Sequence, residues 1–167
     1  MILGKENTIM KTQNIFKRTV LFLLLLLSFG FIHAQDKAQV KLLIESKRFE
    51  FKVQTILPLS GTVRQSTGEY DIRLQGDTLI SDLPYFGRAY SAPMPGERGG
   101  FNFTSTRFSY NAKTKKKGGW EILIQPKDVK DIREYFLTVS EKGYASLRVT
   151  SNSRQPISYS GVIAAVK

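Results

Sequence analysis

The sequence predicts an all-β domain, in which an antiparallel meander of about eight strands follows one short helix and closes into a barrel or half-barrel. From Arg48 onward apolar residues alternate with polar ones, which is the pattern of half-buried strands. These stretches are short and regularly spaced, and tight turns separate most of them, as in antiparallel meanders. The chain contains no cysteine, so the core alone must hold the fold, and closing the sheet removes its edges.

Residues 1–34 have the features of a secretory signal peptide. Basic residues precede an apolar run over residues 19–32, and Ala34 is a small residue at the cleavage boundary. The run is shorter than the roughly 20 residues that a membrane-spanning helix needs. We therefore expect cleavage after Ala34, which leaves residues 35–167 as a single β-barrel-like domain without a transmembrane span. Retention of the segment as an anchor is the alternative.

Composition narrows the chemistry that the mature domain can perform. The only histidine, His33, lies inside the predicted signal peptide, and cysteine is absent. The mature domain therefore lacks the commonest general base, the usual zinc ligands and any thiol nucleophile. We expect a non-enzymatic domain with no catalytic residue, no metal and no cofactor. A hydrolase that uses carboxylates alone, for example Asp71 with Glu121, is the remaining enzymatic alternative.

The predicted helix and strands follow from changes in the spacing of apolar residues along the chain. Residues 36–47 carry apolar side chains at i, i+3 and i+4 spacing, which predicts a short helix that packs on the sheet or over a barrel end. The apolar positions change parity between Phe103 and Phe108, and we interpret this change as a β-bulge near Ser105. Strands are predicted around residues 48–54, 70–75, 78–83, 101–110, 120–124, 135–139, 145–149 and 157–163.

Large residues at inward positions would fill much of such a barrel. We therefore expect a partly filled, lipocalin-like barrel in which any cavity is small. An outer-membrane barrel is excluded because Arg48, Glu50 and Arg73 occupy the face that lipid would contact. The large inward residues are Phe49, Phe51, Tyr70, Phe101, Phe103, Trp120 and Tyr135.

The stretch from Leu83 to Gly96 is the candidate functional segment. It is irregular and rich in proline, which excludes a helix or a long central strand. Tyr85, Arg88 and Tyr90 would offer aromatic faces and a guanidinium group. That combination suits a sugar, a lipid headgroup or a peptide carboxylate.

Two further arginines complete the set of candidate ligand-binding residues. Arg98 and Arg154 join Tyr85, Arg88 and Tyr90 if the loops meet at one end of the barrel. In the alternative interpretation this segment is structural. Its aromatic residues Tyr85 and Phe86 then plug the barrel, and Arg88 binds main-chain carbonyl groups.

Two charged motifs have simpler interpretations. Asp128, Asp131 and Glu134 recur at every third residue, but they lack the glycine-centred loop of a calcium site, so we interpret them as a solvated edge. Residues 113–117 form a lysine-rich loop. Proteins that bind single-stranded nucleic acid usually place aromatic residues among the basic ones, and this loop contains none. We expect a solvated hairpin tip there, and no nucleic-acid partner.

Four motifs resemble those of a family of secreted proteins from Bacteroidetes, domain-of-unknown-function family 4251. The resemblance covers essentially the whole mature region, and it implies secretion and a β-rich, lipocalin-like fold. It implies no activity, because none is assigned to the family. The motifs are Leu57-Pro58-Leu59 with Gly61, Tyr70-Asp71-Ile72-Arg73, Leu83-Pro84-Tyr85-Phe86-Gly87-Arg88-Ala89-Tyr90, and Thr150-Ser151-Asn152 with Arg154-Gln155-Pro156-Ile157.

These observations together favour a binding module in the periplasm or outside the cell. Its expected partner is a small molecule, a glycan or a lipid headgroup at the barrel mouth, and we expect a monomer or weak oligomer. The formal net charge of +11 for the whole chain is compatible with an anionic partner. The alternative is a structural or interaction protein that docks on an envelope partner through a sheet edge or the basic loop.

Overall fold

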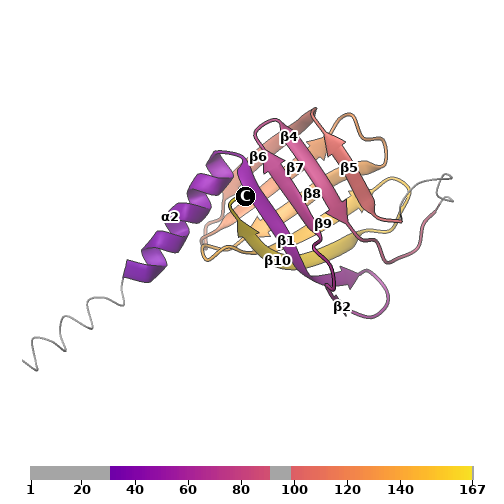
Figure 1. Ribbon diagram of the computed structural model, residues 1–167, viewed down its shortest axis with the longest axis horizontal. Coiled ribbons are helices and arrows are strands. Elements are labelled where there is room, and N and C mark those ends of the chain that lie inside the picture. The colour runs from indigo at the N-terminus through magenta and orange to yellow at the C-terminus, as the bar shows by residue number, and fades with distance from the viewer. Residues whose placement is uncertain (1–30, 91–98, 167) are drawn as a thin grey trace, which may run out of the picture. The chain divides into compact units, whose positions relative to one another are not determined.

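The computed structural model describes residues 31–90 and 99–166 (Figure 1). In this part of the chain, helix α2 (Phe31–Glu45) precedes ten strands, which confirms the all-β class with one N-terminal helix. The strands are β1 (Arg48–Pro58), β2 (Arg64–Gln65), β3 (Asp71–Gln75), β4 (Thr78–Leu83), β5 (Phe101–Ser105), β6 (Phe108–Thr114), β7 (Trp120–Pro126), β8 (Ile132–Val139), β9 (Tyr144–Ser151) and β10 (Ile157–Ala164). No helix among the described residues is long and apolar enough to cross a membrane.

The strands form one antiparallel sheet that curls nearly closed into a barrel. The strand order is β5-β4-β3-β1-β10-β9-β8-β7-β6, with the short β2 paired to β1 beside this path. The first and last long strands, β1 and β10, pair with each other and bring the two ends of the domain together. The sheet ends at β5 and β6, which are neighbours in the sequence but do not pair, so the predicted antiparallel sheet is confirmed as a nearly closed barrel.

The predicted β-bulge near Ser105 is wrong. Strand β5 ends at Ser105 and β6 begins at Phe108, so the apolar parity changes because one strand ends and another begins. The carboxylate of Asp128 holds this corner by accepting hydrogen bonds from the backbone N–H groups of Thr106 and Arg107, at 3.0 and 3.2 Å. Register shifts occur in β1 and β8 instead.

Side chains fill the interior of the barrel. The Tyr135 hydroxyl lies 2.9 Å from the Ser81 hydroxyl, so this buried polar group has a partner. Tyr70 and Phe103 are only partly buried and pack against the core. The interior also contains the buried Tyr159. The remaining residues that we predicted to point inward are all buried, and they are Phe49, Phe51, Phe101, Trp120 and Tyr135.

Helix α2 is fixed to the barrel through its C-terminal half. Val40 and Ile44 are buried in the barrel core, and Tyr110 of β6 donates a hydrogen bond to the Ile44 carbonyl at 2.9 Å. Burial raises the pKa of the Tyr110 hydroxyl, so this group stays protonated and remains a donor. The helix ends at a turn where Lys47 adopts a positive φ of 54°. The predicted packing role of the helix is confirmed.

Candidate functional site

Residues 84–90, which we call the rim segment, follow β4 and run beside the loop between β9 and β10. An antiparallel bridge joins Ala89 to Arg154. The N–H of Tyr90 donates to the carbonyl of Ser153 at 2.7 Å, and the N–H of Gln155 donates to the Arg88 carbonyl at 3.0 Å. The rim segment is therefore held by main-chain hydrogen bonds, although it is not a strand of the sheet.

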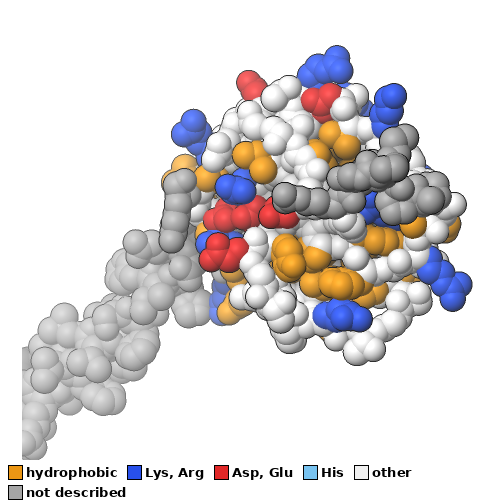
Figure 2. Space-filling model, turned by 45° about the vertical axis from the view of Figure 1, so that its right-hand side comes forward, with side chains coloured by type: hydrophobic (Ala, Val, Ile, Leu, Met, Phe, Trp, Pro, Cys, Tyr) orange, Lys and Arg blue, Asp and Glu red, His pale blue; other side chains and the backbone are white. Residues whose placement is uncertain are grey.

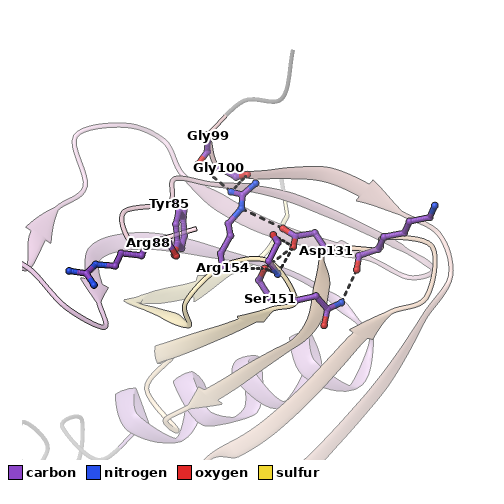
Figure 3. Close-up of polar contacts among 10 residues, drawn as sticks. Tyr85, Arg88, Gly99, Gly100, Asp131, Ser151 and Arg154 are labelled. Atoms are coloured by element: carbon purple, nitrogen blue, oxygen red, sulfur yellow. Dashed lines mark hydrogen bonds and ion pairs between the residues drawn. The ribbon is translucent and has the colours of Figure 1, made fainter. Parts of the chain in front are cut away.

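Arg154 connects this loop to the chain just before β5 (Figure 3). Its Nη1 donates to the carbonyl oxygens of Gly99 and Gly100 at 3.3 and 3.1 Å. The same guanidinium lies 5.4 Å from the ring centroid of Tyr85 and 5.1 Å from that of Phe101. Our alternative interpretation assigned the binding of main-chain carbonyls to Arg88, and the structure gives that role to Arg154.

Asp131 balances the charge of Arg154 and orders the β9–β10 loop. Its Oδ2 lies 3.5 Å from Nε of Arg154, and its Oδ1 accepts from the Ser151 hydroxyl at 2.8 Å. The hydroxyl and the backbone N–H of Ser153 donate to the same oxygen. Asp128 is exposed, as the predicted solvated edge requires, whereas the Asp131 side chain is only 31% exposed. The prediction missed that both carboxylates accept hydrogen bonds from neighbouring loops.

Tyr85 anchors the rim segment from within. Its hydroxyl donates to the carbonyl of Arg88 at 2.7 Å, and its ring packs edge-on against Phe101 with centroids 5.3 Å apart. Partial burial is the main cause that raises the pKa of the Tyr85 hydroxyl. The adjacent Pro84 carbonyl accepts a hydrogen bond from the buried Tyr159 hydroxyl at 2.7 Å. The start of the rim segment is thus tied directly to the core.

The other predicted site residues do not join this cluster. The Arg88 side chain is exposed and extends away from Tyr85 and Arg154 (Figure 3). Tyr90 is 67% exposed, and Arg98 lies outside the described residues. Of the five candidates, the structure brings only Tyr85 and Arg154 together among those it describes. Phe86 does not plug the barrel, as our alternative interpretation required, because its side chain is exposed.

A hollow of about 260 Å³ lies next to Tyr85, between the ends of β4 and β5. Asp82 and Asn102 are cross-strand partners on these two strands, and both are exposed. Our sequence interpretation assigned neither Asp82 nor Asn102 to the site. Only the register of β4 against β5 pairs them, and the sequence carries no signal for that register. The lining residues are Tyr70, Asp82, Leu83, Pro84, Tyr85, Gly99, Gly100 and Asn102.

The carboxylates suggested for a hydrolase are not paired with each other. Asp71 lies on β3 and Glu121 on β7, which are not neighbouring strands, and each has a basic partner of its own, Arg73 at 3.1 Å and Lys115 at 3.9 Å. Burial, and then a hydrogen bond with Glu50, raise the pKa of Asp71. Within the described residues no three or more acidic or histidine side chains are grouped as metal ligands.

The lysine-rich loop is shorter than predicted. Lys113 and Thr114 belong to β6, and the exposed hairpin tip begins at Lys115. The N–H of Lys115 donates to the Gly119 carbonyl at 2.9 Å, which closes the turn. The tip is exposed, as expected for a solvated hairpin.

Comparison with known proteins identifies relatives but no activity. The model of a domain of unknown function, DUF4251, matches residues 33–163. One of three matching solved chains is a DUF4251 family protein from Bacteroides eggerthii, with 15% sequence identity and a TM-score of 0.58 over 79% of this chain and 89% of that chain. At this identity the similarity supports the fold alone. No curated protein matches the chain.

Proposed function

The chain belongs to the DUF4251 family of domains of unknown function, and we propose that it is a non-enzymatic binding module for a small, hydroxyl-bearing ligand. The observation that carries the proposal is the hollow beside Tyr85, where two aromatic rings, a carboxylate and an amide converge. Ligand sites typically combine apolar walls with a few polar groups that fix orientation. The filled interior of the barrel leaves this rim hollow as the better candidate.

The residue types in the hollow suit hydroxyl groups. The Asp82 carboxylate accepts hydrogen bonds, whereas the Asn102 amide both donates and accepts them. Together they can accept a hydrogen bond from a ligand hydroxyl and donate one to it. The rings of Tyr70 and Tyr85 offer apolar faces for the C–H groups of a sugar ring. A volume of about 260 Å³ is below the usual range for drug-sized ligands, which favours a ligand as small as one sugar unit.

The predicted signal peptide suggests in which compartment the domain would encounter its ligand. A domain exported to the periplasm or beyond the cell encounters envelope components, including glycans with exposed sugar units. The absence of histidine and cysteine from residues 35–167 supports binding over catalysis. The domain would act as a monomer or a weak oligomer.

The test is a titration of the purified protein with a panel of monosaccharides and soluble envelope-glycan fragments, followed by calorimetry. For a ligand that binds, Asp82→Asn and Asn102→Ala should each weaken binding by about tenfold, which corresponds to one lost hydrogen bond. Asn111→Ala is the matched control, because Asn111 is an exposed asparagine on β6. Equal binding by all three variants would contradict the proposal.

A protein-docking function is the second candidate, and the open sheet favours it. β5 and β6 are the ends of the described strand order and are not paired with each other. Unpaired edges can accept a strand from another protein. Capture of an envelope protein that is lost when Lys115, Lys116 and Lys117 are changed to Glu would place docking at the basic hairpin. Capture that survives this change would favour the sheet edge.

A further inference from the structure

A second surface, distinct from the hollow, consists of exposed apolar side chains. Five of the large apolar residues that are exposed in the described part of the chain come from two short segments. One segment is the β1–β2 hairpin, and the other is the rim segment. The five residues, which we call the apolar rim surface, are Leu57, Leu59, Val63, Phe86 and Tyr90.

These two segments lie side by side although they are distant in sequence. The guanidinium of Arg64, at the end of the hairpin, lies 4.6 Å from the ring centroid of Phe86. Strand β10 pairs with the end of β1, and the loop just before β10 binds the rim segment through the Gln155–Arg88 hydrogen bond. Figure 2, in which the right-hand side of the Figure 1 view comes forward, shows apolar side chains gathered on this face, with both basic and acidic side chains nearby.

Exposure in this surface is high for apolar residues. Leu59, Val63 and Tyr90 are 66%, 55% and 67% exposed. Single exposed apolar residues are common on proteins, but a cluster of them marks an interaction site. Leu59, Val63, Phe86 and Tyr90 lie outside the named strands, whereas Leu57 lies near the end of β1.

The two segments that carry this surface contain charges of one sign only. Residues 57–65 and 84–90 contain no aspartate or glutamate, but they contain Arg64 and Arg88. Both arginines are exposed, and neither forms an ion pair with another described residue. A guanidinium that stacks on an aromatic ring keeps its N–H edge available for a phosphate. The surface therefore pairs apolar tips with phosphate-binding groups.

We propose that the apolar rim surface docks on the surface of a bilayer that contains anionic phospholipid. Leu59, Val63 and Tyr90 would enter the boundary between headgroups and acyl chains, where tyrosine is favoured because it is apolar with one polar end. Arg64 and Arg88 would bind lipid phosphates. These two segments carry basic charge only, which favours an anionic lipid surface over a protein interface, where charges of both signs are usual. The proposal is independent of the ligand in the hollow.

The test measures co-flotation of the purified protein with vesicles of phosphatidylcholine alone and of phosphatidylcholine mixed equally with phosphatidylglycerol. The triple variant Leu59→Ser/Val63→Ser/Tyr90→Ser should bind mixed vesicles at least about tenfold more weakly, because it removes apolar area that would insert into the bilayer. The control Leu42→Ser/Tyr144→Ser changes two side chains that are 67% and 64% exposed elsewhere, and it should bind like the wild type. All of these positions are exposed, so thermal unfolding should confirm that the variants fold.

Charge variants complete the test. Arg64→Gln/Arg88→Gln should abolish the preference for mixed vesicles, whereas Lys116→Gln/Lys117→Gln, on the basic hairpin, should retain it. The proposal is overturned if the wild type does not float with mixed vesicles, or if the rim and control variants bind equally. Flotation that requires another envelope protein would overturn it too, because a protein would then be the partner.

Discussion

Asp131 and Arg154 form an ion pair across two loops, with Nε of the arginine 3.5 Å from Oδ2 of the aspartate. The Arg154 side chain is only 12% exposed, and its Nη1 donates to the carbonyls of Gly99 and Gly100. Three loops at the rim are therefore joined through one guanidinium. This clamp holds the Gly99–Gly100 wall of the hollow in place, so the candidate site depends on it.

Replacing Arg154 should destabilise the domain more than replacing an exposed arginine. Arg154→Gln leaves Asp131 without its ion-pair partner and two carbonyls without donors, so we expect a loss of about 2 kcal/mol in unfolding free energy. Arg154→Lys should recover part of this loss, because an ammonium cannot reproduce the guanidinium fork. Urea denaturation measures both. Arg148→Gln, at an exposed position on β9, is the control, and an equal effect there would refute the clamp.

Two glycines at the rim should respond differently to alanine. A Cβ on Gly87 would lie 2.6 Å from the Tyr85 hydroxyl, so Gly87→Ala must displace Tyr85 and break its bond to the Arg88 carbonyl. We expect a cost of about 1–2 kcal/mol from this overpacking. A Cβ on Gly99 meets no atom of the described residues within 4 Å, so Gly99→Ala should change stability by less than about 0.5 kcal/mol. Chemical denaturation of the two variants decides the matter, and similar losses would mean that Tyr85 is not locked as described.

The contribution of Asp128 to the stability of the fold should decrease at low pH. Hydrogen bonds, first from the Ser105 hydroxyl, lower its pKa in the folded state. A lowered folded pKa gives stability that is complete above the usual aspartate pKa of about 3.9 and is lost as pH falls through the folded value. Asp128→Asn should therefore lower the unfolding temperature at neutral pH, with the difference shrinking in acid. A difference that does not change with pH would show that the charge has no part in holding the β5–β6 corner.

Asp71 should show the opposite dependence. Burial and the neighbouring Glu50 raise its folded pKa, so the wild type loses stability as pH rises from about 3.9 through the folded value. Asp71→Asn removes this titration, and the variant should gain relative to the wild type as pH approaches neutrality. Unfolding temperatures measured across that range check the sign. A variant that becomes relatively less stable with rising pH would indicate that the ion pair with Arg73 outweighs the burial.

The fold could be predicted because period-two alternation reports burial directly. Phe49 and Phe51 alternate with charged neighbours, and both lie in the core. The parity change near Ser105 was detected but misassigned, because a bulge and a break between strands give the same local pattern. The two-residue β2 was not predicted, because a strand this short has no period to detect.

The site was harder to predict because it depends on tertiary contacts. The rim segment was identified from its aromatic residues and prolines, but nothing local shows that Arg88 faces away while Arg154 turns inward. Asp82 and Asn102 become neighbours only through the β4–β5 register, which the sequence does not specify across the intervening residues. The residue types in a sequence can therefore identify a candidate segment. Which of its side chains lie in one site depends on how the strands and loops pair in the folded structure.

The most direct test of the binding proposal is an amide-resolved NMR titration with the same panel of monosaccharides and soluble glycan fragments. We predict that a bound ligand shifts the amide signals of residues 82–85 and 99–102, at the ends of β4 and β5, and leaves the basic hairpin unchanged. Signals that move only outside these two segments, or a panel that moves no signal at all, would contradict a ligand site at the rim.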